Sequence, residues 1–520
     1  MRSTFLLAGL SACLSPVHGD AALLSDAEGY NGGKYGTNPN QTYHSSKIVS
    51  PLIQINKWEK TKVDDTPYIF LGLSGDSLEG DRGHSGPVIL RTDDLSLVYA
   101  EPRWPNAADV KVGTANGVDY LTFYEGAQNP LWEGHCLLYD SSYRVAYNIS
   151  VPSGHGSMDM HECQVTANGT VVVTTYETIS FDLTSAGGPE DGNLVDGVAQ
   201  EIDIETGEVL WTWRASDHVD LRDSYANYHD GGPVGWDFFH MNSIDKSAEG
   251  NYLISSRHFH SLYYIDGQTG GKLWTLGGKK NNFTDISDSN ALNFAWQHHA
   301  RVRDESITQL TLFDNHELGT SIGCSDNCSR GKHLEIDHEN MKARLLHDYL
   351  HPESLNTGYM GSYQATPKGN VLAGWGPNPS ITEYLPGGEC VFDMQFDTWD
   401  AGKAGARGSY RAFKMEWKGF PDWDPSIVAV KKRDGLKAYV SWNGATEVAE
   451  WQLLQGVSPD TTTDAVLSIS RAGFETEIAL QDGHLRYIRA AAIDAHGQIL
   501  GYSGTLDLKT DVAVEDLDDV

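Results

Sequence analysis

Two short patterns repeat along this chain, and they limit its possible folds more than any other feature. The first, D-x-x-T-G-x-x-x-W, occurs at residues 203–211 and again at residues 266–274, each time after an aliphatic, strand-like run. The second is a turn followed by a β-rich run, with the turn glycine at Gly169, Gly250 and Gly369. The two patterns alternate, as hairpins do in a chain that folds into successive blades of a β-propeller.

The rest of the chain agrees with an all-β fold. Between about residues 50 and 420, short apolar runs are separated by Gly, Asn, Asp and Pro, and no long stretch has a convincing helical period. We therefore expect a six-bladed β-propeller. From residue 427 onward the runs are shorter and evenly spaced, which predicts a small Ig/fibronectin III-like β-sandwich with Trp442 buried in it. The expected parts are a signal peptide (1–19), the propeller (20–424), the sandwich (425–509) and an acidic tail (510–520).

The N-terminus is typical of a secretory signal peptide, because Arg2 is followed by an apolar run at residues 5–10 and by a permissive cleavage residue, Gly19. The sequence therefore predicts a secreted protein or a protein of the secretory pathway. No later run approaches the roughly 18 to 20 apolar residues that a membrane span needs. Five sequons agree with this route and are predicted glycosylation sites: Asn40, Asn148, Asn168, Asn282 and Asn327.

The cysteines support an oxidising compartment. Once the cysteine of the signal peptide is removed, an odd number remains, so at least one thiol is expected to be free. Cys324 and Cys328 lie close together in a polar loop, which favours a disulfide between them over a zinc site. Cys390 is our candidate for the free thiol. The sequence leaves the pairing of Cys136 and Cys163 open.

Three histidines occupy equivalent places in the repeat. His161, His240 and His298 each lie in the strand that enters a turn of the second pattern. In a propeller the first strand of each blade lines the central channel, so these three side chains are expected to converge. We predict that all three are catalytic, although one such histidine alone is just as often part of a structural hydrogen-bond network.

Other side chains near these histidines suit an oxyanion. Asn242 lies two residues after His240, on the same side of a regular strand, and Arg257 ends the neighbouring strand. Arginine offers forked donors to sulfate or phosphate, and histidine can act as nucleophile or proton carrier near neutral pH. Arg257 is therefore a predicted catalytic residue and Asn242 a substrate-binding one. His258 and Gln297 adjoin this group and are further candidates for substrate binding.

Some of the chain's other properties restrict its partners. The sequence has 38 Lys plus Arg against 71 Asp plus Glu, and this net charge of −33 argues against nucleic acid. Histidines outside the repeat phase, such as His155, His260 and His299, are more typically structural, as His258 also would be by position alone. We expect no metal, because the sequence places no carboxylate firmly beside the three imidazoles.

Several segments carry a family resemblance. In the same order along the chain, they resemble segments of the fungal branch of the arylsulfotransferase family: residues 159–162, 239–244, 254–258, 274–279, 296–298, 312–315, 361–375 and 381–383. In the bacterial arylsulfate sulfotransferases of this family, a histidine takes the sulfuryl group from a phenolic sulfate ester and passes it to a second phenol. The resemblance implies that His298 is this nucleophile, with His161, His240, Asn242 and Arg257 as sulfate-binding or acid/base partners. It also implies a small aromatic or phenolic substrate, with no cofactor and no nucleotide sulfate donor.

The chain departs from the bacterial enzymes in two respects. Its additional module is C-terminal instead of N-terminal, and the Cys324 and Cys328 pair follows the motif of His298 instead of preceding it. Two other functions therefore stay open. One is a secondary-metabolite enzyme, such as a cyclase, a dehydratase or a pericyclase of the Diels-Alderase kind, which uses the same channel without a covalent step. The other is a propeller that binds a ligand or glycan without catalysis.

Overall fold

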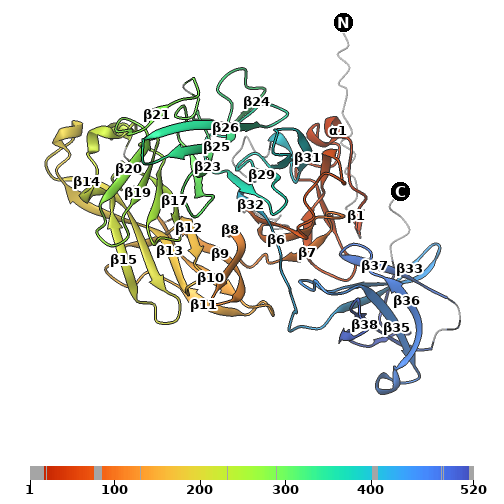
Figure 1. The fold of residues 1–520 in the computed structure, drawn as a ribbon. Helices are drawn as coiled ribbons and strands as arrows, with labels where there is room; N and C mark the ends of the chain where they lie inside the picture. Colours follow the sequence, from red (N-terminus) through yellow and green to blue (C-terminus); the bar gives the residue numbers. More distant parts are fainter. Residues whose placement is uncertain are drawn as a thin grey trace, which may run out of the picture.

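The computed structural model describes residues 17–18, 20–74, 85–128, 131–230, 232, 234–288, 290–400, 408–481, 483 and 485–514. Its regular structure is almost entirely β (Figure 1), with a short helix α1 (Ala27–Asn31) near the N-terminus. Most of the predicted signal peptide lies outside the described residues. Within the parts of the chain that the structure describes, no helix is long and apolar enough to cross a membrane.

The central domain is a ring of six β-sheets, which confirms the predicted six-bladed propeller. From the innermost strand outward, blades one to three are β8 (Ala108–Ala115), β9 (Val118–Gln128), β10 (Trp132–Tyr139), β11 (Val145–Ile149); β12 (Ser157–Val165), β13 (Thr170–Phe181), β14 (Gly192–Asp203), β15 (Val209–Arg214); and β17 (Met241–Lys246), β18 (Tyr252–Ser256), β19 (Ser261–Ile265), β20 (Lys272–Gly277). Blades four to six are β22 (His298–Val302), β23 (Gln309–Asp314), β25 (Arg330–Asp337), β26 (Lys342–Leu350); β28 (Ser362–Ala365), β29 (Val371–Gly374), β30 (Ser380–Tyr384), β31 (Cys390–Gln395); and β32 (Ser409–Met415), β5 (Tyr68–Leu73), β6 (Gly86–Arg91), β7 (Leu97–Ala100).

Short elements decorate this ring. The strands are β1 (Val17–His18), β2 (Asn40–Thr42), β3 (Val49–Pro51), β16 (Trp236–Asp237), β21 (Thr284–Asp285), β24 (Ser321–Ile322) and β27 (Leu355–Asn356), and the 3-10 helices are η1 (Thr184–Ala186), η2 (Ala215–Asp217), η3 (Leu221–Asp223), η4 (Tyr228–Asp230) and η5 (Pro459–Thr461). β1 to β3 form a small sheet of their own, next to the sandwich described below.

Segments from both ends of the propeller close the ring. Blade six combines the late strand β32 with the early strands β5 to β7, and β4 (Gln54–Trp58) pairs with β31 at the outer edge of blade five. These pairings satisfy backbone groups that would otherwise be exposed at sheet edges.

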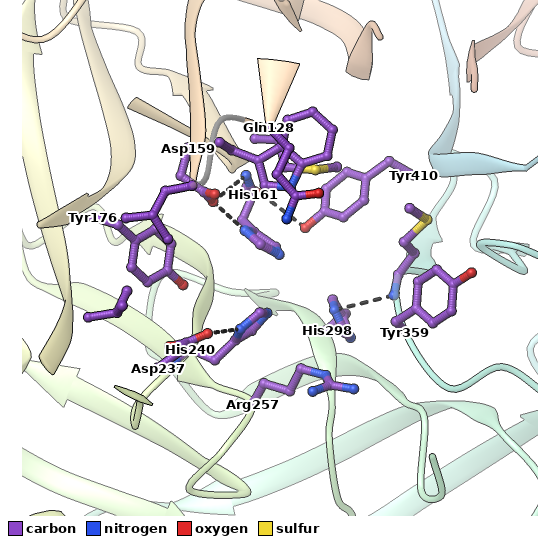
Figure 2. A pocket seen from close by; sticks show the side chains of 15 residues that line it. Gln128, Asp159, His161, Tyr176, Asp237, His240, Arg257, His298, Tyr359 and Tyr410 are labelled. Carbon is purple, nitrogen blue, oxygen red and sulfur yellow. Dashed lines mark hydrogen bonds and ion pairs between the residues drawn. The ribbon is translucent and has the colours of Figure 1, made fainter. Parts of the chain in front are cut away.

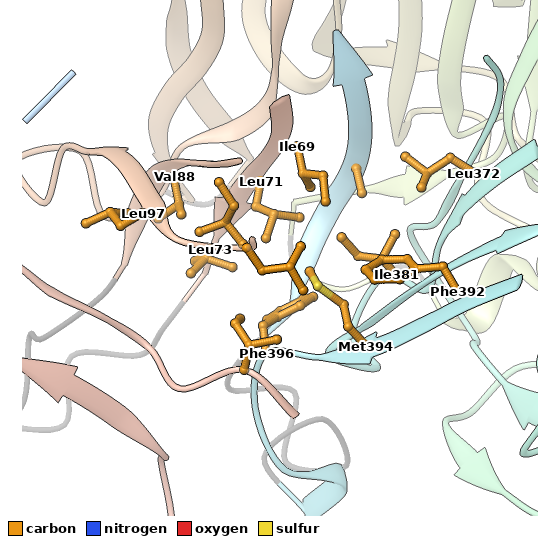
Figure 3. Packing of buried hydrophobic residues seen from close by; sticks show 14 of the residues in the cluster. Ile69, Leu71, Leu73, Val88, Leu97, Leu372, Ile381, Phe392, Met394 and Phe396 are labelled. Atoms are coloured by element: carbon orange, nitrogen blue, oxygen red, sulfur yellow. The ribbon is translucent and has the colours of Figure 1, made fainter. Parts of the chain in front are cut away.

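A separate apolar cluster fills each junction between neighbouring blades. Because successive residues of a strand point to opposite faces, β13 sends Val171 and Val173 toward blade one and Val172 toward blade three. Figure 3 shows the junction of blades five and six, where Leu71 and Val88 meet Ile381 and Met394. Burial on both faces explains why the strands read as continuous apolar runs.

The C-terminal part is a β-sandwich, as predicted. One sheet has the order β37 (Glu475–Leu480), β34 (Gly435–Ser441), β33 (Ser426–Lys432), β41 (Val512–Val514), and the other β36 (Asp464–Ser470), β35 (Glu450–Gly456), β38 (Tyr487–Ile493), β39 (Ile499–Tyr502), with β40 (Leu506–Asp507) beside β38. The buried tryptophan is Trp451 in β35, whereas Trp442 follows β34 and is only half-buried, so that expectation was wrong. The fibronectin III assignment and the domain boundaries stay predictions.

Two disulfides are present among the described residues. Cys324 and Cys328 are joined and Cys390 is free, as predicted, while the second bond joins Cys136 of β10 to Cys163 of β12 and so links blades one and two.

Four of the predicted glycosylation sites have exposed side chains, at Asn148, Asn168, Asn282 and Asn327, and Asn40 is half-buried. Their modification stays a prediction.

Candidate active site

The innermost strands of the blades surround a cavity of about 420 Å³ at one level of the channel. His161 lies in β12, His240 directly precedes β17, and His298 begins β22. Figure 2 shows these three imidazoles around the same space, with Arg257 beside two of them. The structure therefore brings together the four residues that the sequence predicted to be catalytic.

Bulges at this level turn the side chains into the channel. The pairing register shifts in five of the innermost strands, β8, β12, β17, β22 and β32. A bulge bends a strand and redirects its side chains. At β17 the shift follows His240, which has a φ of +50°. His240 therefore reaches the cavity while Asn242 does not, and the expectation that both lie on one side of a regular strand was wrong.

His161 and His240 are each held by a carboxylate. The Nδ1 atom of His161 pairs with Asp159, and that of His240 lies 2.5 Å from Oδ2 of Asp237. The two rings are 4.8 Å apart, centroid to centroid. Since the carboxylates occupy Nδ1, the Nε2 atom of each ring is left for the cavity. Burial, followed by His161 and Arg257, holds the pKa of His240 well below its usual range, so this ring is neutral at neutral pH.

His298 is held differently, because its partner is an amide. Its Nδ1 atom lies 2.7 Å from Oδ1 of Asn315, and its Nε2 accepts the backbone N–H of Met360 at 3.3 Å. The side chain is buried, and this burial together with the nearby Arg257 lowers its pKa well below the usual range. A neutral imidazole with a nitrogen lone pair is the form that can act as a nucleophile.

Arg257 supplies positive charge to the cavity. Its guanidinium donates from Nη2 to the carbonyl oxygen of Gly358 at 3.0 Å and lies over Trp296 at 5.1 Å. Its Nε is buried and has no partner among the described residues. Of the described residues that line the cavity, Arg257 is the one with a guanidinium or ammonium group. A held guanidinium with unused donors is suited to an oxyanion.

The remaining wall of the cavity is largely aromatic. Trp132, Tyr176, Tyr359 and Tyr410 line it together with Leu131 and Met160. Aromatic and apolar walls with a few convergent polar groups are typical of sites for small aromatic ligands.

Buried ion pairs adjoin two of the cavity histidines. Glu162 of β12 contacts Arg301 at 2.7 Å, Arg411 at 3.0 Å and Lys111 at 3.3 Å. Arg411 also donates to the backbone oxygens of His161 and Asn242, at 2.8 and 3.1 Å. This group therefore fixes the two strands that carry His161 and His240. No pattern in the sequence pointed to it.

The three predicted substrate-binding residues do not line the cavity. Asn242 is buried and donates to the backbone oxygen of Gln297 at 2.6 Å. The amide of Gln297 donates to three oxygens of β18 and β19. His258 donates from Nδ1 to the backbone oxygen of Asp237, and its Nε2 lies 3.1 Å from Nη1 of Arg257. It therefore contacts two residues of the cavity wall without lining the cavity itself. Direct contact of these three with substrate stays a prediction.

A carboxylate lies closer to the imidazoles than the sequence indicated. Asp237, His240 and His258 each offer one ligand atom, all within 4.8 Å of one another. Both ring nitrogens of His258 are, however, already engaged, and Arg257 adds a positive charge at the same place. A cation would have to displace these contacts, so this donor set fits a metal poorly.

Comparison with known proteins agrees with this geometry. Residues 112–397 match the sequence model of the Arylsulfotransferase (ASST) family, which is more than half of the chain. The chain belongs to the arylsulfotransferase family. The matched region contains all three cavity histidines and Arg257, as the motifs predicted; the fungal branch stays a prediction.

Solved structures add little to this arylsulfotransferase assignment. A protein of unknown function from Bacteroides caccae is 11% identical, covers 61% of this chain and 93% of its own, and has a TM-score of 0.23. Virginiamycin B lyase from Staphylococcus aureus is 10% identical, covers 65% of this chain and 87% of its own, and has a TM-score of 0.31. These scores are too low to support an inference from either structure. A search of curated proteins gave no match.

Proposed function

We propose that this protein is an enzyme of the secretory pathway that transfers a sulfuryl group from an aryl sulfate to a phenol through His298. The observation that carries the proposal is the neutral imidazole of His298 facing, with Arg257, a cavity that has aromatic walls. The two disulfides support an oxidising compartment.

The aryl sulfate donor binds to two parts of the cavity wall, one charged and one aromatic. The sulfate oxygens lie against the free donors of Arg257, and the aryl ring lies against the aromatic wall. An anion bound beside His161 and His240 favours the protonated form of these rings, whose Nε2–H groups then also donate to sulfate oxygens.

In the first half-reaction the Nε2 lone pair of His298 gives up its 3.3 Å contact with the backbone N–H of Met360 and attacks sulfur. An N–S bond forms, the bond between sulfur and the aryl oxygen breaks, and the electron pair leaves with the phenolate. The phenolate takes a proton from the Nε2–H of His161 or His240. The product is a sulfohistidine whose ring is positively charged and still carries its Nδ1 proton.

In the second half-reaction a phenol replaces the departed product. The same imidazole that gave up a proton now accepts the hydroxyl proton of the acceptor. The acceptor oxygen attacks sulfur, the N–S bond breaks, and His298 returns to its neutral form. Atoms and charge balance over the cycle, and no further reactant is needed.

The first prediction is that wild-type protein quenched at alkaline pH, shortly after mixing with 4-nitrophenyl sulfate, gains the mass of one sulfuryl group on His298. Its release of nitrophenol should equal the adduct formed. Replacing His298 with Asn should abolish both signals, because an amide cannot act as the nucleophile. The measurement is intact-protein and peptide mass spectrometry.

His496→Asn is the control, because His496 is exposed and lies in the sandwich, far along the chain from the cavity residues. It should behave as wild type. Absence of both adduct and phenol release across several aryl sulfates would overturn sulfotransfer. Under the cyclase alternative, loss of His298 would leave a residual activity, with a decrease of about two to four orders of magnitude, as for a general acid or base.

A further inference from the structure

We propose that Asn315 is a positioning residue that holds His298 as the Nδ1–H tautomer, so that the lone pair lies on Nε2, beside the N–H of Met360 at the cavity wall. The catalytic meaning of this tautomer rests on the sulfotransfer proposed above, but the tautomer itself does not. Asn315 directly follows β23 and is buried.

The orientation of the Asn315 amide is fixed by its neighbours. Its Nδ2 donates to the backbone oxygens of Thr357 and Met360, at 2.6 and 2.9 Å. A flipped amide would place Oδ1 against these two acceptors, which is repulsive. The atom that faces Nδ1 of His298 is therefore the acceptor Oδ1, and Nδ1 must carry the hydrogen.

The other side of the ring leads to the same assignment. The Nε2 atom of His298 faces the backbone N–H of Met360, which can only donate. Nε2 must therefore carry the lone pair. The neighbouring His299 has the opposite arrangement, because its Nδ1 accepts the backbone N–H of Tyr363. The tautomer of His298 thus comes from its own contacts and is not shared along the strand.

The chemical nature of the partner separates His298 from the other two cavity histidines. Nδ1 of His161 and Nδ1 of His240 each face a carboxylate, whose negative charge can offset a positive charge on the ring when a proton is carried. A neutral amide orients Nδ1–H without this charge stabilisation. Burial and the nearby Arg257 keep the pKa of His298 low, and the amide adds no negative charge that would oppose them or stabilise the charged sulfohistidine.

The other charged groups around His298 either help to keep it unprotonated or are the same in every variant compared below. The titratable and charged groups that face it are Arg257, His161 and His240, together with the hydroxyls of Tyr359 and Tyr410 on the cavity wall. Arg257 lowers the pKa of His298 further. A carboxylate at residue 315 would act against this lowering of the pKa, because it would contact Nδ1 of His298 directly.

The second prediction concerns Asn315→Asp. We expect the pKa of His298 to rise by about one unit or more, because a carboxylate then faces Nδ1. Two-bond 15N–1H correlation spectra of histidine-labelled protein, recorded against pH, report both the tautomer and this pKa, and His298→Asn identifies the signal. Wild type should show the Nδ1–H tautomer. With 4-nitrophenyl sulfate, Asn315→Asp should keep its initial release of nitrophenol but lower kcat, because the sulfohistidine becomes too stable.

Asn378→Asp is the matched control. Asn378 is buried and its amide holds the same loop, at the backbone oxygen of Asn356 and the hydroxyl of Thr357, but it does not touch His298. It should leave the tautomer and the pKa as in wild type. Asn315→Ala removes the 2.7 Å contact and leaves only the longer, 3.3 Å contact of Met360 to favour Nδ1–H, so it should give a mixture of tautomers without a raised pKa. It decides the matter if Asn315→Asp does not fold.

An Nε2–H tautomer in wild type, a pure Nδ1–H tautomer in Asn315→Ala, or an equal pKa rise in Asn378→Asp would each overturn the proposal. A wild-type protein with the Nδ1–H tautomer but no sulfuryl adduct would overturn the sulfotransfer and leave the role of Asn315 intact.

Discussion

Arg257 is the residue whose chemistry most restricts what the cavity can bind. Its guanidinium is held on one side by the carbonyl oxygen of Gly358 and lies over the ring of Trp296. With the contact of Nη1 to His258 at 3.1 Å, they hold the guanidinium at the cavity wall. A lysine would keep the charge but lose the fork and the stacking.

The third prediction therefore concerns Arg257→Lys. We expect kcat/KM for the aryl sulfate to fall by about one to three orders of magnitude, less than the complete loss in His298→Asn, because charge remains near the sulfate. Steady-state release of nitrophenol measures this. Arg214→Lys is the control, since Arg214 pairs with Glu177 and Asp196 and does not line the cavity. Equal losses in the two variants would contradict the role of Arg257.

Sequence reasoning found the phased histidines but not their partners. His161, His240 and His298 were recognisable because each precedes a turn of the repeat. Asp159 and Asp237 lie two and three residues before their histidines, and that spacing alone has many structural explanations. Asn315 acts through contacts with residues 42 and 45 positions later in the chain, which no local pattern reveals. The misplacement of Asn242 has a single cause, the bulge in β17.

At the scale of elements, the two repeated patterns are the two hairpins of a blade. The glycine turns join β12 to β13, β17 to β18 and β28 to β29, and the D-x-x-T-G-x-x-x-W segments join β14 to β15 and β19 to β20. Such local hairpins were predictable from the sequence. The closing pairings of β4 with β31 and of β5 with β32 were not, because they join segments more than 300 residues apart.

The fourth prediction concerns the bond between β10 and β12. Cys136 and Cys163 close a loop with a sequence separation of 27, against 4 for Cys324 and Cys328. In the chain-entropy description the longer loop contributes about 3.5 kcal/mol and the shorter about 2 kcal/mol. Replacing Cys136 and Cys163 with Ala should therefore lower the free energy of unfolding more than replacing the other pair. Urea unfolding followed by circular dichroism measures both.

The buried positions of Cys136 and Cys163 strengthen this expectation, because they lie in the apolar cluster between blades one and two. A stability loss in that variant equal to or below that of the Cys324 and Cys328 variant would contradict it. Since Cys163 lies two residues from His161, we also expect the kcat of the variant that lacks Cys136 and Cys163 to fall.

At the scale of the whole molecule, the sandwich contacts the propeller through a few specific groups. Figure 1 shows it beside β6 and β7 of blade six. The hydroxyl of Tyr143 donates to the backbone oxygen of Gly444 at 2.7 Å, and Gly444 donates to the backbone oxygen of Val98. Phe474 of the sandwich packs on Tyr43, in the cluster between blades five and six. The two domains therefore share buried surface, although every described residue that lines the cavity belongs to the propeller.

The fifth prediction is that a chain ending at Asp424 folds and still forms the sulfuryl adduct, but melts at a lower temperature than the full chain. The cavity survives because its walls are built from β12, β17, β22 and their neighbours, none of which pairs with a sandwich strand. Stability falls because Tyr43 and Tyr143 lose their buried partners. The matched variant is Tyr143→Phe in the full chain, which removes the hydrogen bond to Gly444 and the one from Trp417 and should cost about 2 kcal/mol. Thermal unfolding by circular dichroism and the mass of the adduct measure both effects. An insoluble or unfolded shorter chain would show that the propeller depends on the sandwich, and a folded one without adduct would show that the sandwich shapes the cavity.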